Sequence, residues 1–257
     1  MKRRDVRVAA LAVVLLAAAL GVLLLTRGER TPDRPSEPAS PALVRPVPHP
    51  RMPAQRPRPP RGPLGARVLR RVQLRERPGG PVVRAVGTLT GYNSPRVLAV
   101  VARRGRWIGV LSDHVANSRA AWIPADAVEL LHEPYRLDVD LSARRLTVRR
   151  EGRVVRRVRV AVGKPGTATP TGRFAVTDAL RIDDAHPQYG CCALALTGRQ
   201  PDVPQGWTGG DRLAIHGTGA TGSIGTPASN GCLRATDADM RWLLRHVTLG
   251  AQVRIRR

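Results

Sequence analysis

Two residues near the end of the chain have the types and the spacing of a catalytic pair. His216 is followed by Gly217, and Cys232, 16 residues further on, is preceded by Gly231. A cysteine nucleophile acts as its thiolate, and an imidazole is the usual group that takes the thiol proton. Glycine permits a close approach of the backbone and leaves amides able to face a developing oxyanion. The pattern predicts attack on a carbonyl through a thioester, although a packed cysteine and an unrelated histidine are the commoner meaning of two such residues.

The residues around this pair predict a domain that is mainly β. From Tyr135 onward, apolar and polar side chains alternate in segments joined by short turns, which is typical of antiparallel hairpins. Four apolar residues then recur at the spacing of one helix face, behind a threonine that can cap the helix. These residues are Met240, Leu243, Leu244 and Val247, and the threonine is Thr236. A final strand is expected at Val253 and Ile255, and a strand that ends at His216 would face a loop that returns to Cys232.

A second, smaller domain is expected over residues 66–133. Short apolar segments broken by turn residues predict several strands, which indicates a small β-barrel. The strands are expected at Val97–Val101, Trp107–Leu111 and Ala121–Ile123. The run from Trp107 to Val128 resembles bacterial SH3-like domains, which often bind wall peptides. Trp107 and Trp122 are as well suited to a core as to a ligand platform, so no site is assigned there.

His216-Gly-Thr is followed, further along the chain, by Ser229-Asn-Gly-Cys232-Leu-Arg234. This pattern is similar to the signature of the L,D-transpeptidase catalytic domain, the YkuD fold, and the similarity is not confined to these residues. It extends upstream over three further segments, which are Leu137–Val148, Val160–Gly166 and Thr169–Gly172. One departure is Asn230, which stands where the motif is often written with a histidine. The resemblance implies a β-sandwich catalytic domain with one short helix at residues 134–257, acting on peptidoglycan outside the membrane.

The resemblance also implies a reaction. Cys232 would attack an L,D peptide bond of a tetrapeptide donor stem, with His216 as general base and later as acid. The carbonyl of Gly217 would accept the other imidazole N–H and fix the tautomer. An acceptor amine would resolve the thioester to a 3-3 cross-link or another remodelled wall product, whereas water would give L,D-carboxypeptidase activity. No cofactor or metal is implied, and carbapenem-type inhibitors are expected to acylate the same thiol.

Further roles follow from the same resemblance. The oxyanion hole would be formed by the amides of Asn230, Gly231 and Cys232. The candidate substrate-binding residues are Arg234, Ser229 and Thr218, of which Arg234 would hold a carboxylate or brace the loop. The rival class is a non-catalytic peptidoglycan-binding wall protein, in which the cysteine loop has lost its activity.

The first 65 residues predict an anchor and a spacer. Val8 to Leu25 is an uncharged apolar run that would be about 27 Å long as a helix, close to the thickness of a bilayer core. No Ala-x-Ala cleavage site follows it, which favours a retained anchor, with a cleaved signal peptide as the alternative. Residues 1–30 are therefore expected to be a cytoplasmic tip and a transmembrane helix of the cytoplasmic membrane, with the body facing the cell wall. Residues 31–65 hold more than half of the 23 prolines and should form an extended linker.

The net charge of +24 comes almost wholly from arginine, since Lys2 and Lys164 are the only lysines among 43 basic residues. Aromatic residues make up 3% of the chain, which leaves few platforms for stacking bases, so a nucleic-acid partner is not expected. A solvated arginine-rich surface is the simplest meaning. Attraction to an anionic wall polymer or membrane surface is the functional alternative.

Cys191 and Cys192 are adjacent in the sequence. A bridge between neighbouring cysteines is strained, so two small loop residues are expected, with a bond between them as the alternative outside the cytoplasm. A zinc site that combines them with His216 and Cys232 would lack any recognised ligand spacing.

Overall fold

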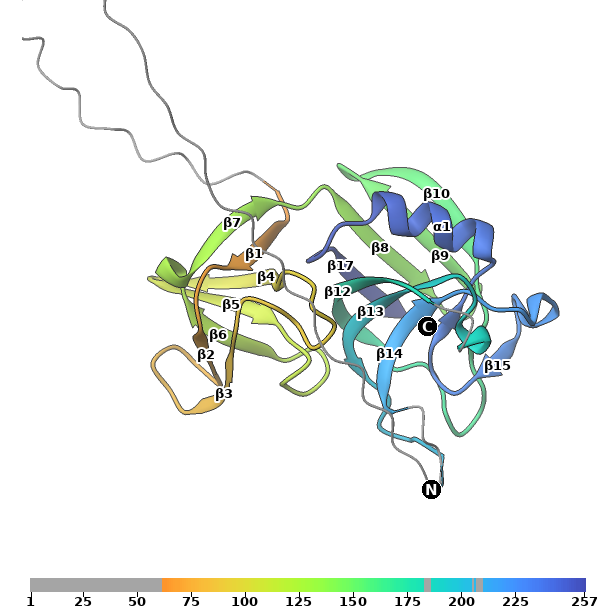
Figure 1. Cartoon of the computed structure of the whole chain (residues 1–257), viewed down its shortest axis with the longest axis horizontal. Coiled ribbons are helices and arrows are strands. Elements are labelled where there is room, and N and C mark those ends of the chain that lie inside the picture. Colours follow the sequence, from red (N-terminus) through yellow and green to blue (C-terminus); the bar gives the residue numbers. More distant parts are fainter. Residues whose placement is uncertain (1–61, 183–185, 205, 207–209) are drawn as a thin grey trace, which may run out of the picture. The chain divides into compact units, whose positions relative to one another are not determined.

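The computed structural model describes residues 62–182, 186–204, 206 and 210–257 (Figure 1). The chain divides into two units, Met1–Gln55 and Arg56–Arg257. The expected anchor and nearly all of the expected linker lie outside the described residues. Within the described part, no helix is long and apolar enough to cross a membrane.

Residues 64–132 form a seven-stranded antiparallel sheet in the order β3-β2-β6-β5-β4-β1-β7. Its strands are β1 (Leu64–Val68), β2 (Val72–Arg75), β3 (Val82–Val86), β4 (Val97–Arg104), β5 (Trp107–Leu111), β6 (Ala120–Pro124) and β7 (Val128–His132), with a 3-10 turn at Ala125–Ala127. Leu74, Ile108 and Ile123 are fully buried in its core. The three expected strands are confirmed as β4, β5 and β6, whereas the SH3-like fold type stays a prediction.

An eight-stranded sheet follows, in the order β10-β9-β8-β17-β12-β13-β14-β16. The strands are β8 (Tyr135–Asp140), β9 (Arg145–Arg150), β10 (Arg153–Arg159), β12 (Gly172–Arg181), β13 (Cys192–Arg199), β14 (Arg212–His216), β16 (Leu233–Arg234) and β17 (Gln252–Arg256), and β11 (Val162–Gly163) pairs separately with β15 (Pro227–Ser229). β12 pairs with β17 through its first residues and with β13 through its last, with an irregularity between Val176 and Asp178. The two halves of the sheet share one apolar core, to which both Leu137 and Leu194 belong.

The helix α1 (Asp237–His246) forms where the helical spacing placed it. The side chain of Thr236 accepts a hydrogen bond from the amide of Asp239 at 3.1 Å, which satisfies one of the free donors of the first turn. Met240 and Leu243 are fully buried against the sheet core. The helix, its cap and the final strand β17 are therefore confirmed.

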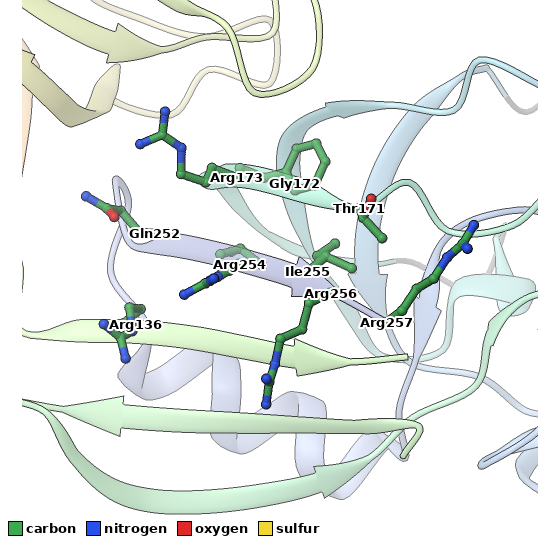
Figure 2. Close-up of a pocket in the computed structure, with 11 residues that line it drawn as sticks. Arg136, Thr171, Gly172, Arg173, Gln252, Arg254, Ile255, Arg256 and Arg257 are labelled. Carbon is green, nitrogen blue, oxygen red and sulfur yellow. The ribbon is translucent and has the colours of Figure 1, made fainter. Parts of the chain in front are cut away.

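β17 lies between β8 and β12 and shows strict alternation. Val253 and Ile255 are buried, whereas Arg254 and Arg256 are exposed on the opposite face (Figure 2). The period of two gives this part of the sheet one apolar and one basic face.

The expectation that Cys191 and Cys192 are unbonded loop residues is wrong. Cys192 begins β13, and the two cysteines are joined by a disulfide. The amide of Cys191 donates to the carboxylate of Asp237 at 3.2 Å, which holds the turn before the strand. All residues of β13 except Arg199 are buried, so the strand lacks the polar alternation that reveals a half-exposed strand in a sequence.

Candidate active site

The parallel pairing of β14 with β16 brings the expected catalytic pair to one place. The register sets His216 opposite Arg234, and Cys232 directly precedes β16. The thiol of Cys232 donates to the carbonyl oxygen of Arg212, with 3.8 Å between sulfur and oxygen. His216 and Cys232 line the same cavity, whose volume is about 950 Å³. The two residues, 16 apart in the sequence, therefore face one space on the protein.

The His216 ring is held in one orientation. Its Nδ1 lies 2.6 Å from the carbonyl oxygen of Gly217, and its ring makes an edge contact with Tyr189 at 5.0 Å between centroids. Because a carbonyl can only accept a hydrogen bond, the proton of the neutral ring belongs on Nδ1. Nε2 is then left as the basic nitrogen, which is the tautomer that a general base needs.

Burial dominates the protonation of His216, which is 3% exposed. The pKa of His216 is lowered to about 4, chiefly by desolvation. The Arg234 cation acts in the same direction, whereas hydrogen bonds to the backbone of Gly217 and Tyr189 raise the pKa. The imidazole is therefore neutral at physiological pH. The two backbone contacts favour the imidazolium, which is the form that exists once a thiol proton has been taken.

The thiol of Cys232 is neutral in the resting protein as well. Burial raises the pKa of Cys232, while the backbone of Ala214 and the charge of Arg234 act in the opposite direction. The resting pair is thus a thiol and a neutral imidazole, not a preformed ion pair. The positive charge of Arg234 lowers the pKa of both groups. It therefore favours the thiolate of Cys232 and disfavours the imidazolium of His216.

The loop before Cys232 is closed by its own hydrogen bonds. The hydroxyl of Ser229 donates to the carbonyl oxygen of Cys232 at 2.6 Å and accepts from the amide of Gly231 at 3.1 Å. The amide of Gly231 is therefore engaged within the loop. Among the described residues, no hydrogen bond is made by the amides of Asn230 and Cys232, so these two donors remain available to an oxyanion.

Gln200 fixes this loop from outside. Its Nε2 donates to the carbonyls of Thr167 and Ala168, each at 3.0 Å, and to that of Asn230 at 3.4 Å. Gly231 has φ of +120°, and a Cβ there would come within 2.4 Å of the Gln200 Nε2. The loop therefore requires glycine at position 231 both for its backbone conformation and for the approach of Gln200.

Gly217, next to His216, is also constrained by its neighbours. A Cβ on Gly217 would lie 2.2 Å from Oδ1 of Asp237 and 3.1 Å from the amide nitrogen of Cys191. The amide of Gly217 donates to the carbonyl oxygen of Cys192 at 3.0 Å. The carbonyl that orients His216 is thus held by the disulfide turn and the first residue of α1.

The three expected substrate-binding residues differ in position. Thr218 is 5% exposed, its hydroxyl accepts from the amide of Ala220, and it does not line the cavity. Ser229 is 1% exposed, and both hydrogen bonds of its hydroxyl lie within the loop, while its carbonyl accepts from the amide of Lys164 and the hydroxyl of Thr167. Arg234 lines the cavity, and its buried Nε has no hydrogen-bond partner in the described part of the chain. Arg234 is therefore the member of this group best placed to meet a substrate.

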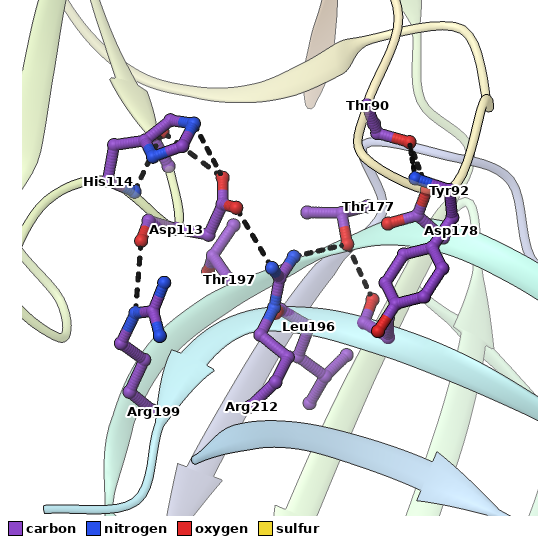
Figure 3. A network of polar contacts seen from close by, with 12 residues as sticks. Thr90, Tyr92, Asp113, His114, Thr177, Asp178, Leu196, Thr197, Arg199 and Arg212 are labelled. Carbon is purple, nitrogen blue, oxygen red and sulfur yellow. Dashed lines mark hydrogen bonds and ion pairs between the residues drawn. The ribbon is translucent and has the colours of Figure 1, made fainter. Parts of the chain in front are cut away.

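The N-terminal sheet contacts the catalytic domain at β14, the strand that ends at His216. Arg212 pairs with Asp113, which follows β5, at 2.9 Å, and donates to the hydroxyl of Thr177 at 2.8 Å (Figure 3). Thr90 donates to the buried carboxylate of Asp178, and Tyr92 from the same loop lines the catalytic cavity. Burial alone would raise the pKa of Asp113, but the Arg212 guanidinium and His114 hold it below its usual value.

Several of these residues have no signal in the sequence. Tyr189, Gln200 and Arg212 belong to no motif, and each acts through a contact between segments far apart in the chain. Patterns in a single sequence predict local structure and not which distant segments contact one another, so these contacts could be identified only from the structure.

Residues 134–255 match the family model of the L,D-transpeptidase catalytic domain, YkuD. A putative L,D-transpeptidase YkuD of Bacillus subtilis (strain 168) is 32% identical over 124 residues, which is 48% of this chain and 67% of that protein. A probable L,D-transpeptidase ErfK/SrfK of Salmonella typhimurium (strain LT2) is 32% identical over 111 residues, which covers 37% of this chain and 35% of that protein. A crystal structure of L,D-transpeptidase 3 from Mycobacterium tuberculosis with a faropenem-derived adduct aligns with a TM-score of 0.40 and 16% identity, covering 54% of this chain and 73% of that one.

A mainly β domain with one helix carries a cysteine and an oriented histidine on a single cavity. Together with the family match and the relatives, this defines an acyl-transfer enzyme of the cysteine class. The chain belongs to the L,D-transpeptidase catalytic domain family, YkuD.

Proposed function

We propose that this L,D-transpeptidase transfers an acyl group from a peptidoglycan tetrapeptide stem, through a thioester on Cys232, to an acceptor amine. The observation that carries the proposal is the geometry of the cavity. It presents the Cys232 thiol together with an imidazole whose Nδ1 is held 2.6 Å from the Gly217 carbonyl oxygen. Nε2 of His216 is the nitrogen left to take the thiol proton.

The acylation step follows from this arrangement. Nε2 of His216 accepts the proton of the Cys232 thiol as Sγ attacks the carbonyl carbon of the L,D bond. The oxyanion receives hydrogen bonds from the amides of Asn230 and Cys232. When the tetrahedral intermediate collapses, the C–N bond breaks and the leaving D-residue takes the proton from the imidazolium, which leaves a thioester and a neutral imidazole.

Deacylation reverses the proton path. The acceptor amine attacks the thioester, His216 removes the proton of that amine, and the thiol regains it as the C–S bond breaks. Water in place of the amine gives the carboxypeptidase product, and the stem products of a donor-plus-acceptor reaction distinguish the two. The orphan Nε of Arg234 supports a role in binding a stem carboxylate, since a guanidinium pairs well with that group.

We also propose that the body works outside the cytoplasmic membrane, tethered by the apolar run Val8–Leu25 and the linker at residues 31–65. The disulfide between Cys191 and Cys192 supports this location, because disulfides persist in oxidising compartments. An SH3-like domain at residues 66–133 would add affinity for wall peptides. Protease added to spheroplasts should digest the body, and full protection of the body would refute the location.

Intact-mass spectrometry of the full chain in a mild non-ionic detergent tests the reaction. The protein is incubated with a purified tetrapeptide stem and, separately, with a carbapenem, a class represented by imipenem in a solved structure of the related LdtMt1. We expect one covalent adduct that maps to Cys232. Since the other two cysteines are disulfide-bonded, iodoacetamide should also label a single thiol.

The matched control is Cys232→Ser, which keeps the shape of the loop. It should form no thioester and take no iodoacetamide. A folded native chain that reacts with iodoacetamide at Cys232 but forms no adduct with either substrate would favour the non-catalytic wall-binding alternative.

A further inference from the structure

One face of the transpeptidase sheet is an array of arginines. The strand registers place Arg254 opposite Arg173 on one side and opposite Asp138 on the other, and Gln252 opposite Arg136. Figure 2 shows the arginines of these pairs and Gln252 on the same face of β8, β17 and β12. We call this surface the arginine face. It consists of Arg136, Arg149, Arg173, Arg254, Arg256 and Arg257.

Carboxylates on these strands neutralise only part of that charge. Asp138 pairs with Arg136 at 3.2 Å and with Arg149 at 3.0 Å, and Asp140 pairs with Arg256 at 3.6 Å. Arg173, Arg254 and Arg257 are exposed and form no ion pair with any residue that the structure describes. The face therefore carries a clear excess of positive charge.

The shape of this surface suits an extended polyanion. All residues of the arginine face except Arg149 border a groove with a volume of about 600 Å³, which Gly172 and Ile255 also line. Neighbouring strands are about 4.8 Å apart and residues on one face of a strand about 7 Å apart, so the cations form a regular two-dimensional array. A flexible chain with an anion at every repeat can meet several of them at once.

The composition of the face argues against two other anionic partners. Val253 and Ile255 point into the core, and among the described residues the large exposed apolar side chains lie elsewhere, for example at Leu69 and Tyr92. A membrane-binding surface would need apolar side chains to enter the lipid, and a surface for single-stranded nucleic acid would need aromatic platforms. The arginine face offers charge and hydrogen-bond donors alone.

The groove is separate from the catalytic cavity. None of the described residues lines both, so a polymer held at the arginine face leaves Cys232 and His216 accessible. We infer that the arginine face binds a linear phosphodiester polymer of the cell wall and so holds the transpeptidase domain against its substrate. The inference goes beyond the proposed reaction, since binding requires no active Cys232.

Binding of the full chain, in a non-ionic detergent, to fluorescent poly(glycerol phosphate) tests the inference. Affinity should fall steeply with salt, because each guanidinium–phosphate contact releases a counterion. In the triple variant Arg173→Gln, Arg254→Gln, Arg257→Gln, the Kd should rise at least tenfold, and the slope of log K against log salt should fall by about 2. The matched control is Arg71→Gln, Arg103→Gln, Arg245→Gln, which removes the same charge from exposed arginines outside the face. Its Kd should rise less than threefold.

An equal loss in the two triple variants would overturn the inference, because the attraction would then be diffuse. Absence of binding by the native chain would overturn it as well. Two further arms use phosphatidylglycerol vesicles and double-stranded DNA. A face-dependent affinity for either that exceeds the affinity for poly(glycerol phosphate) would reject the wall polymer as the partner. Carbapenem acylation of Cys232 should be unchanged in both triple variants, so a failure of the inference and a failure of the proposed reaction are separate results.

Discussion

At the level of single residues, burial sets the chemistry of Cys232 and His216. Both groups are neutral in the resting protein, because desolvation raises the pKa of the thiol and lowers that of the imidazole. The thiolate therefore forms as the substrate reacts and is not stored beforehand. This separates the site from cysteine enzymes in which a thiolate and an imidazolium pair before substrate arrives.

A pH profile follows from these two shifts. Acylation of the full chain by a carbapenem needs a neutral imidazole, so the rate should be constant between about pH 5 and 8 and fall as the pH approaches 4, the pKa of His216. Stopped-flow fluorescence or quenched intact-mass measurements would give the profile. An acid limb centred near pH 6.5 would show that His216 titrates as an ordinary histidine and would contradict its burial.

The same shift links His216 to stability. The folded state binds the His216 proton only near pH 4, whereas the unfolded chain binds it near 6.5, so the unfolded state holds more protons between these values. The free energy of unfolding should therefore decrease as the pH falls from 6.5 to 4, with about 3 kcal/mol from this residue. Urea unfolding at several pH values would measure it. His216→Gln should lose this part of the slope, and identical slopes in the two proteins would refute the assignment.

At the level of elements, the catalytic loop depends on a residue from another segment. Gln200 donates to three backbone carbonyls, of Thr167, Ala168 and Asn230. Gln200→Ala leaves these groups without that donor, so we expect the free energy of unfolding to fall by about 2 kcal/mol and carbapenem acylation to slow by roughly tenfold. Gln188→Ala is the control, because Gln188 is exposed on the same cavity. Equal acylation rates in the two variants would show that Gln200 does not position the loop.

Helices and strands with a clear hydrophobic periodicity could be predicted from the sequence. Helix α1 and its Thr236 cap follow from a spacing of 3.6, and β17 follows from alternation. Strand β13 was not predicted, because nearly all of its residues are buried on both faces and so show no alternation of apolar and polar side chains. The parallel pairing of β14 with β16 was not visible either, since periodicity predicts a strand without naming its neighbour.

The catalytic pair of the site could be predicted from the sequence, but the contacts that hold it in place could not. The types and spacing of His216 and Cys232 pointed to the chemistry, and the family motif supplied the role of Gly217. The hydrogen bond from the Gly231 amide to Ser229 was not expected, because the closing of a loop by one hydroxyl depends on its full backbone path. Arg212 and Asp113, 99 residues apart, could be joined only by the fold.

At the level of the whole molecule, the N-terminal sheet supports the catalytic strand through the Arg212–Asp113 pair. Both side chains are largely buried, with exposed fractions of 22% and 14%. Asp113→Asn removes the charge that compensates Arg212, so we expect the free energy of unfolding to fall by about 2 to 3 kcal/mol, together with slower acylation of Cys232. Denaturant titration and the carbapenem assay on the full chain would test both effects.

Asp126→Asn is the matched control for this prediction. Asp126 pairs with Arg70 at 3.2 Å, but both side chains are exposed, and such pairs contribute less than about 1 kcal/mol. Similar losses in the two variants would mean that the contact between the sheets adds nothing specific. The depressed pKa of Asp113 also implies that the pair stabilises the fold at neutral pH, and that this contribution is lost only as the pH falls through the folded-state pKa of Asp113, below its ordinary value of 3.8.

The arginine face has a chemical consequence that its charge alone does not reveal. An enzyme that carries an acyl thioester reacts with primary amines, and a lysine side chain is a primary amine. A guanidinium stays protonated and is a poor nucleophile, so a surface of arginines supplies positive charge without competing acceptors. Lys164 is the one lysine in the described part of the chain, and it adjoins the catalytic loop through its amide hydrogen bond to Ser229. The arginine face can therefore supply positive charge without adding primary amines, and Lys164 is the one described side chain left as a competing acceptor.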